Sequence, residues 1–332
     1  MKQILLLSII SIFLFSCGEN EEFYKIEGET QGTTYHITYK GLHPNLKKEV
    51  DSILHDFDMS LSTYEPNSII SQINQGKHVE LDKYFKDMYY KAKEVTEKSG
   101  GAFDITVGPL INAYGFGYGE AETKIDSSLI DSLLQYVGMD KIRIEMNYLV
   151  KDNPNIQISG NAIAQGQSVD IVSDYFESKG INDYMVEIGG ELKVKGLKYG
   201  QKWRVGIDKP IEGNNIAGEE LQTILAITDK AMATSGNYRR FYIKDGKKYS
   251  HSINPKTGYP AYQNILSATI LADDCMTADA YATACMVSGL EKSIEMVEND
   301  PSLDAYFVYS DEDTGEMKVY YTKAVEKLIV KK

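Results

Sequence analysis

Hydrophobic residues follow helical spacing in the first half of the chain. Apolar positions recur from Leu46 to Phe57 and again from Leu81 to Val95, so we expect an amphipathic helix over each stretch. Gly100-Gly101 would end the second helix. Between the apolar start of the chain and these helices, Gly32–Tyr39 is rich in β-branched and aromatic residues, which is typical of a strand.

The middle of the chain predicts two further helices separated by short strands. Asp126 can cap a helix over Ser127–Val137 that ends at Gly138, and Ala164–Phe176 again shows a helical pattern. Short strands are expected between these helices at 142–144, 148–150 and 156–158.

The second half alternates short apolar runs with turn residues. We expect strands at 184–188, 192–195, 203–207, 223–227, 239–243, 249–253 and 266–271. One helix is expected from about Met276 to Val287. The hairpin-like spacing indicates a mostly antiparallel sheet with flanking helices, which is an α+β fold.

The N-terminus has the pattern of an export signal. The apolar run Ile4–Phe15 is too short to span a bilayer as a helix but suits a signal-peptide core over residues 1–16. A small residue and Cys17 follow the run directly and resemble a bacterial lipobox, so we expect a diacylated Cys17 and a lipid anchor with tether over 17–30. The globular domain would then cover 31–332. A plain secretory signal with an incidental cysteine is the alternative.

Composition limits the ligands that the domain can bind. The net charge of −13 argues against nucleic acid and anionic lipid surfaces as partners, because both are bound through an excess of Lys and Arg. The chain contains only four arginines: Arg143, Arg204, Arg239 and Arg240. A phosphate-bearing ligand would therefore depend on a divalent cation and on backbone N–H groups. Cys275 and Cys285 are too few for a disulfide framework.

Clusters of small and polar residues recur along the chain, and packing alone does not explain them. In chain order they are Gln31–Tyr35, Phe57–Ser68, Gly101–Leu110, Tyr114–Gly117, Ser159–Asp170, Glu187–Glu191, Ala233–Arg239, His251–Gly258 and Thr277–Ala284. Each cluster alone is a weak signal. Their joint order closely resembles the FAD:protein FMN transferase (ApbE) family from Gln31 to about Gly289.

Asp279 and Thr283 are four residues apart on the predicted C-terminal helix, so a carboxylate and a hydroxyl share one face. Hard oxygen donors suit Mg²⁺. By spacing alone, Asp279 could instead stabilise the helix dipole and Thr283 could be an ordinary helical threonine. The resemblance implies a metal site formed by Asp279, Thr283 and a backbone oxygen of Ala162.

His251 precedes Asn254–Gly258, whose Pro and Gly predict a tight turn. An imidazole with an ordinary pKa of about 6.5 can take a proton from an attacking hydroxyl. By itself the residue could equally be a histidine without a catalytic role. The resemblance implies that His251 belongs to the site, and the choice between His251 and Asp279 as general base stays open.

The resemblance also implies where FAD binds. Ala102, Phe103 and Asp104 would receive the adenine side, although a helix end followed by a buried Phe explains the same residues. Tyr64 would lie against the flavin, which suits an aromatic side chain. The remaining FAD-binding residues implied by the resemblance are Gln31, Ser159, Gln165, Gly189, Gly190, Ser235, Gly236, His251 and Ile253.

One glycine-rich segment departs from the family pattern. Many members have Asp-Leu-Gly-Gly-Ile-Ala-Lys-Gly, whereas this chain has Ser159, Gly160, Asn161 and Ala162 in the first four places and Gln165 in place of the lysine. The loss of a cation near a diphosphate increases the dependence on the metal.

The resemblance implies that FAD binds in a cleft between the helical first part and the strand-rich second part. A Thr or Ser hydroxyl of a client flavoprotein would attack the phosphorus on the riboflavin side, and AMP would leave. The enzyme would be anchored to a bacterial membrane, facing the periplasm or the exterior. The alternatives are an Mg²⁺-dependent FAD diphosphatase that gives FMN and AMP, and a non-catalytic FAD-binding lipoprotein.

Overall fold

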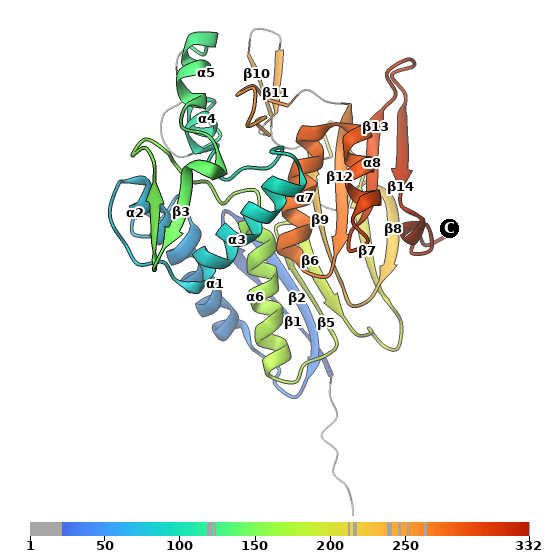
Figure 1. Cartoon of the computed structure of the whole chain (residues 1–332). Helices are drawn as coiled ribbons and strands as arrows, with labels where there is room; N and C mark the ends of the chain where they lie inside the picture. Colours follow the sequence, from blue (N-terminus) through green and yellow to red (C-terminus); the bar gives the residue numbers. More distant parts are fainter. Residues whose placement is uncertain are drawn as a thin grey trace, which may run out of the picture.

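An eight-stranded sheet in the order β1-β2-β5-β6-β9-β12-β13-β14 forms the centre of the molecule, and all its ladders are antiparallel (Figure 1). The computed structural model describes residues 22–117, 122, 124–211, 213–214, 218–237, 241–244, 247–250, 252–261 and 264–331. The strands are β1 (Glu22–Thr30), β2 (Thr33–Gly41), β5 (Tyr184–Ile188), β6 (Glu191–Lys195), β9 (Lys230–Gly236), β12 (Ile265–Ala272), β13 (Asp304–Ser310) and β14 (Met317–Tyr321).

Helices and three small hairpins surround this sheet. The helices are α1 (Lys47–Leu61), α2 (Ile69–Asn74), α3 (Lys83–Lys98), α4 (Gly108–Ala113), α5 (Ser127–Leu134), η1 (Met139–Lys141), α6 (Ala164–Ser178), α7 (Cys275–Ser288), α8 (Leu290–Asn299) and α9 (Lys323–Glu326). The hairpins are β3 (Ile142–Glu145) with β4 (Tyr148–Lys151), β7 (Trp203–Asp208) with β8 (Leu221–Ile227), and β10 (Phe241–Lys244) with β11 (Lys247–Ser250). No helix within the described part of the chain is long and apolar enough to cross a bilayer.

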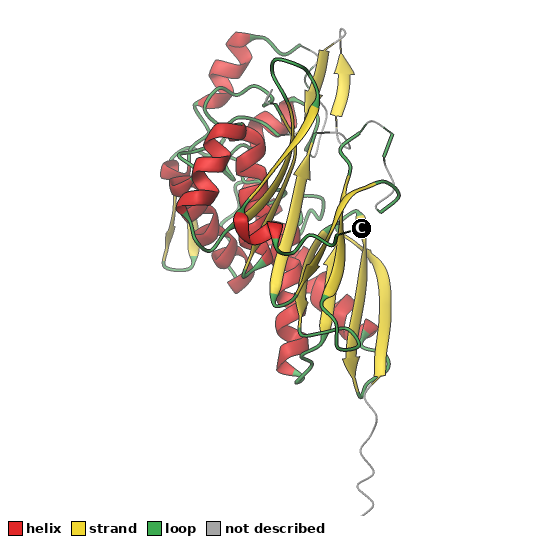
Figure 2. Ribbon diagram, turned by 90° about the vertical axis from the view of Figure 1, so that its right-hand side faces the viewer, coloured by secondary structure: helices red, strands yellow, loops and turns green. Residues whose placement is uncertain are grey.

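The two faces of the sheet are covered differently (Figure 2). On one face, α1 packs on β1 and α6 packs over β5 and β6, while α7 packs over β9 and β12 and α3 packs against α7. On the other face, the β7–β8 hairpin and α9 enclose a smaller core around Trp203. Because β12 is covered on both faces, seven of its eight residues are buried instead of every second one.

Several segments that carry predicted ligand residues meet at one end of the sheet. The β1–β2 turn contains Gln31, and the β5–β6 turn consists of Gly189 and Gly190. Since Tyr35 of β2 pairs with Ile188 of β5, both turns lie at the same end. Because β5 pairs with β6 and β6 pairs with β9, the last residues of β9 lie at this end as well.

The sequence pattern predicted most of these elements. The two amphipathic helices are confirmed as α1 and α3, and the antiparallel sheet is confirmed as well. The strand predicted at 156–158 is wrong, because only an isolated bridge joins Val107 to Gln157. The helix capped by Asp126 ends at Leu134, before the expected boundary.

Residues 22–30, predicted to be part of a tether, form strand β1. All nine residues pair with β2, from Glu22 opposite Gly41 to Thr30 opposite Thr33. Aromatic pairing supports the ladder, because the rings of Tyr24 and Tyr39 lie 5.9 Å apart. The folded domain therefore begins within five residues of Cys17, which itself lies outside the described residues together with the predicted signal peptide.

Candidate functional site

Asp279 joins the two helices that meet at the centre of the site. It is buried in α7, and its Oδ2 accepts a hydrogen bond of 3.0 Å from the backbone N–H of Gly166 in the first turn of α6. A Cβ atom at residue 166 would lie 2.3 Å from the carbonyl oxygen of Cys275, so this close crossing requires glycine. Burial raises the pKa of Asp279 to about 7, and the Gly166 amide opposes that shift.

Thr283 lies one helical turn beyond Asp279, as the spacing predicted. Its Oγ1 is 3.4 Å from the Oγ of Ser235, near the end of β9. Asp279, Thr283 and Ser235 thus supply oxygen atoms from α7 and the neighbouring strand, and the described residues give Asp279 no ion-pair partner. A buried carboxylate beside hydroxyl oxygens fits Mg²⁺, which compensates such a charge and prefers oxygen ligands.

The segment before α6 contains Ala162, whose backbone oxygen is the third metal ligand that the resemblance implies. The N–H of Gln167 donates to Ile163 O, in the ordinary helical pattern, whereas the N–H of Gly166 donates to Asp279. The carbonyl of Ala162 is therefore not bonded by the amide four residues later. No group of three or more His, Cys, Asp or Glu side chains suited to a metal exists in the described part of the chain.

Gln165 and Gly189 lie against each other beside this centre. A Cβ at Gly189 would be 2.5 Å from Nε2 of Gln165, and the N–H of Gly189 donates to Thr34 O at 3.0 Å. Gly189 and Gly190 both have positive φ, as a two-residue hairpin turn requires. The structure thus brings three of the predicted ligand residues together from α6 and one turn.

Gln31 lies in the β1–β2 turn with an uncommon backbone angle and a buried side-chain amide that has no partner among the described residues. Its φ is +52°, which is uncommon for a residue other than glycine. The Oε1 and Nε2 atoms of its side chain are both buried and have no hydrogen-bond partner among the described residues. Buried amides without partners are rare and costly, so this side chain has the properties expected of a ligand contact.

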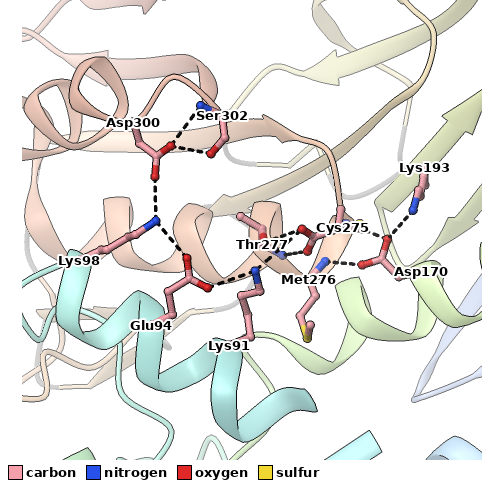
Figure 3. A network of polar contacts seen from close by, with 11 residues as sticks. Lys91, Glu94, Lys98, Asp170, Lys193, Cys275, Met276, Thr277, Asp300 and Ser302 are labelled. Carbon is pink, nitrogen blue, oxygen red and sulfur yellow. Dashed lines mark hydrogen bonds and ion pairs between the residues drawn. The ribbon is translucent and has the colours of Figure 1, made fainter.

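Asp170, the last residue of the Ser159–Asp170 cluster and not one of the predicted ligand residues, holds the beginning of α7 (Figure 3). Asp170 of α6 accepts hydrogen bonds from the N–H groups of Cys275 at 2.9 Å and Met276 at 2.8 Å, and it pairs with Lys193 at 3.3 Å. Burial raises the pKa of Asp170 to about 6, while Lys193 and the two amides oppose the shift. Gly166 and Asp170 are four positions apart, so two successive turns of α6 fix α7.

A second set of ion pairs ties α3 to α7 and α8 (Figure 3). Lys91 lies 3.9 Å from Asp274, the residue that caps α7, and Lys98 lies 3.2 Å from Asp300. In the sequence, Lys91 and Lys98 cannot be told from ordinary surface lysines. Only the packing of α3 against α7 distinguishes them.

The Ala102–Asp104 segment offers less to a ligand than expected. The ring of Phe103 is buried in the core, and the Asp104 carboxylate accepts hydrogen bonds from the N–H and Oγ1 of Thr106 and from the N–H of Met139. Burial raises the pKa of Asp104. Phe103 is thus buried, as the alternative of a helix end followed by a buried Phe expected, whereas Asp104 is hydrogen-bonded within the fold and also lines the neighbouring pocket. Contact of this segment with the adenine side stays a prediction. Its backbone groups and Ala102 remain for ligand contact.

A pocket of about 570 Å³ lies beside this segment. Its lining comes from the last turns of α3, the loop before η1, the start of β3 and the Pro255-Lys256 turn, and comprises Tyr89, Lys93, Thr96, Glu97, Gly101, Asp104, Val137, Gly138, Met139, Asp140, Ile142, Arg143, Pro255 and Lys256. Lys256 lies over Gly101, because a Cβ at residue 101 would be 3.1 Å from its Cε. The pocket shares none of its lining with the Asp279–Thr283 pair.

The remaining predicted residues occupy different surroundings. Tyr64 is exposed, and Ser159 is buried with its N–H donating to Ile105 O. Ile253 is buried in a small apolar cluster, so only its backbone can face a ligand. Gly236 pairs with Ser267 at the end of β9. His251 lies outside the described residues.

Comparison with known proteins identifies the family of this chain. The chain matches the ApbE family over residues 31–307, and it belongs to that family. The FAD:protein FMN transferase of Vibrio cholerae serotype O1 is 38% identical over 307 residues, which cover 88% of this chain and 90% of the relative. The FAD:protein FMN transferase of Escherichia coli K12 is 32% identical over 302 residues, covering 87% and 85%.

Solved structures agree with the assignment. The flavin transferase ApbE from Vibrio cholerae superimposes with a TM-score of 0.81 at 33% identity, covering 93% of this chain and 99% of that protein. The apo form of the Pseudomonas stutzeri flavinyl transferase ApbE gives a TM-score of 0.81 at 31% identity, covering 93% and 97%.

Proposed function

We propose that this protein transfers FMN from FAD to a Thr or Ser hydroxyl of a client flavoprotein and releases AMP. The observation that carries the proposal is the buried Asp279, which lies one helical turn from Thr283 and has no cationic partner among the described residues, in a chain that belongs to the ApbE family. Such a centre suits a reaction at phosphorus, where negative charge has to be compensated.

The residues fit a bound Mg²⁺ held by Asp279, Thr283 and the carbonyl of Ala162. When bound, the metal would neutralise the FAD diphosphate and help AMP to leave. Gly166 fixes the orientation of the carboxylate through its N–H, and Asp170 fixes the helix that carries it. With the metal compensating the phosphate charge in this way, the site would need few arginines.

We place the two ends of FAD on the two halves of the site. The pocket beside Ala102 would take the adenine end, with Pro255 and Lys256 on its other wall. Gln31 and the Gly189-Gly190 turn would contact the diphosphate and flavin parts, which would give the Gln31 amide its missing partners. The exposed ring of Tyr64 would cover the flavin.

In the reaction, the client hydroxyl oxygen forms a bond to the phosphorus on the riboflavin side. The bond from that phosphorus to the bridging oxygen breaks, and AMP carries the electron pair away. The hydroxyl proton passes to a base, for which Asp279 and His251 are the candidates. Positioning of the hydroxyl against the diphosphate would supply much of the rate.

The test is to incubate the protein with FAD, Mg²⁺ and a candidate client, followed by the intact mass of the client. We expect the client to gain one FMN unit, and we expect Asp279→Asn to remove this gain. Asp273→Asn, which changes an exposed carboxylate paired with Lys230, is the matched control and should label normally. Release of FMN and AMP without any labelled client would assign the protein as an FAD diphosphatase, and FAD binding without turnover would assign a carrier.

We further propose that the protein is exported and anchored by a diacylated Cys17. The support is the apolar run followed directly by Ser16-Cys17. Cys17→Ser should abolish partitioning into detergent while soluble transferase activity stays intact. A variant that still partitions as the parent does would contradict the anchor.

A further inference from the structure

We propose that the end of the molecule where β1 begins carries a rim that lies on the lipid surface and orients the anchored enzyme. The rim is formed by Leu42, Leu197 and Tyr199, with Lys198, whose ammonium lies over the Trp203 ring, between the last two in the chain. The inference rests on the proposed anchor at Cys17 and goes beyond it, because an anchor alone does not decide which face meets the membrane.

Hydrogen bonds and ring contacts bring the three apolar residues together. The N–H of Lys40, two residues before Leu42, donates to Asp183 O, and Oδ1 of the same Asp183 accepts from the N–H of Leu197 at 2.7 Å. The ring of Tyr199 lies 4.6 Å from that of Phe23, the second residue of β1. All of these residues therefore lie where the described chain begins.

The three residues that form the rim are largely apolar and yet exposed to solvent. Tyr199 is 76% exposed, Leu42 49% and Leu197 40%. Aromatic and aliphatic residues next to lysines are the composition of surfaces that lie at a membrane interface. Scattered single apolar residues are normal on soluble proteins, but here three gather beside one chain end.

Tyr199 is held outward by a strained turn. Tyr199 and Gly200 form a two-residue connection between Lys198 and Gln201, whose backbone groups bond to each other, and both have positive φ, +52° for Tyr199. Asn, Asp or Gly is ordinary at these positions, and a bulky side chain there is an outlier. A conformation that costs free energy and exposes an aromatic ring points to a role for that ring.

The local charge differs from the charge of the whole molecule. Two of the acidic residues at this end, Asp183 and Asp229, accept hydrogen bonds from the backbone N–H groups of Leu197 and Gly196. Glu22 is also exposed here, so the end is not strongly basic. The net charge of −13 opposes recruitment to anionic lipid, and the rim accordingly orients a protein that the anchor already holds.

The chain between the anchor and β1 is too short to let the domain turn freely. Five residue steps separate Cys17 from Glu22, and they span at most about 18 Å when fully extended. The lipid surface must therefore lie close to the start of β1, and the nearest side chains that suit it are those of the rim.

This orientation sets the position of the candidate site. β2 has nine residues, a length of about 30 Å, and it runs from the turn after Gln31 to the rim. Gln31, Gly189 and Ser235 lie at the far end of these strands. The enzyme would thus present its site to clients roughly one strand length above the lipid surface.

Trp203 provides the probe, because it is the only tryptophan of the chain and lies 6.1 Å from Phe23, directly behind the rim. The full-length lipidated protein is reconstituted into vesicles of phosphatidylcholine with brominated acyl chains, and tryptophan fluorescence is compared with that in unbrominated vesicles. We expect lower tryptophan fluorescence in the brominated vesicles, since interfacial residues enter the headgroup boundary by several ångströms and Trp203 lies just behind them.

The variant Leu197→Ser with Tyr199→Asn should lose most of this quenching. Asn suits the turn, so the substitution at 199 does not threaten folding. Tyr90→Ser with Met146→Ser removes an exposed aromatic and an exposed aliphatic residue away from the rim and should quench as the parent does.

The outcomes separate the rim from the anchor. Vesicle flotation without quenching in the parent, or equal quenching in the rim variant, would overturn the rim alone. Failure of the parent to float would overturn the anchor, and the rim with it. If the rim variant labels a client more slowly in detergent, where no bilayer exists, the surface binds the client protein and the lipid assignment is wrong.

Discussion

The N–H of Gly166 donates to Oδ2 of Asp279 across 3.0 Å, and this single contact joins α6 to α7 at the centre of the site. The crossing is close because residue 166 has no side chain. The same two helices are held one turn further along, where Asp170 accepts from Cys275 and Met276.

Gly166→Ala should therefore damage the site more than the fold. The added Cβ would meet the Cys275 carbonyl at 2.3 Å and the Cβ of Asp279 at 2.8 Å, so α7 has to shift. We expect a loss of about 1–3 kcal/mol in the free energy of unfolding from overpacking. FMN transfer should fall roughly 100-fold, because small displacements of reacting groups are costly.

Chemical denaturation and client labelling measure these two effects. Gly41→Ala is the control, since its Cβ would make only ordinary contacts of 3.6 Å with Ile181. Unchanged transfer by Gly166→Ala would show that the α6–α7 contact does not set the position of Asp279.

Gln31→Met should weaken the binding of FAD without lowering the free energy of unfolding. The buried amide of Gln31 has no partner in the described structure, so its removal should leave the free energy of unfolding unchanged or raise it by about 1 kcal/mol. FAD affinity should fall about tenfold through the loss of hydrogen bonds to the ligand. Fluorescence titration with FAD and denaturant unfolding provide both values.

Asn112→Leu should have the opposite effect, because it should lower stability and leave FAD binding unchanged. The Asn112 amide donates to Gln157 at 2.7 Å, so this variant should lose about 1 kcal/mol of stability and keep its FAD affinity. Equal FAD affinity in the parent and in Gln31→Met would remove Gln31 from the binding site.

Asp170→Ala should destabilise the protein by about 3–5 kcal/mol, since it leaves two amides and Lys193 without their buried acceptor. Asp274→Ala, which removes the cap of α7 and the long, partly exposed ion pair with Lys91, should cost only about 1 kcal/mol. Adding Lys193→Met to Asp170→Ala should recover part of the loss, and denaturation of the double-mutant cycle measures the coupling. Strictly additive losses would contradict a linked pair.

Tyr64→Asn should favour hydrolysis of FAD by water over transfer of FMN to the client. Removal of the ring would open the proposed flavin side of the site, so we expect hydrolysis of FAD to FMN and AMP to rise while client labelling falls. Chromatography of the nucleotides and the mass of the client count both products. Tyr90→Asn, a change at another exposed tyrosine, should alter neither. An identical product ratio in Tyr64→Asn would exclude Tyr64 as the cover.

Much of the fold could be predicted because its signals are local. The periodicity of α1 and α3, the cap of Asp126 on α5 and the hairpin turn at Gly189-Gly190 each depend on neighbours within a few residues. The same holds for Asp279 and Thr283, which helical spacing alone places on one face.

The strands β1 and β9 could not be predicted in this way. β9 is made of small residues such as Ala231 and Ala233, which leave room for α7 and carry little strand preference of their own. β1 follows a polar segment directly, and its strand character depends on pairing with β2 along its whole length.

The sequence by itself determined which chemical groups are present, the helices that carry them and the family to which their order belongs. Only the tertiary structure decided that Gly166 meets Asp279 across 113 positions, that Asp170 holds α7, and that Phe103 and Asp104 face inward. The physical reason is that capping and periodicity act over a few residues. Helix crossings and the burial of a carboxylate depend on segments that only the packed core brings together.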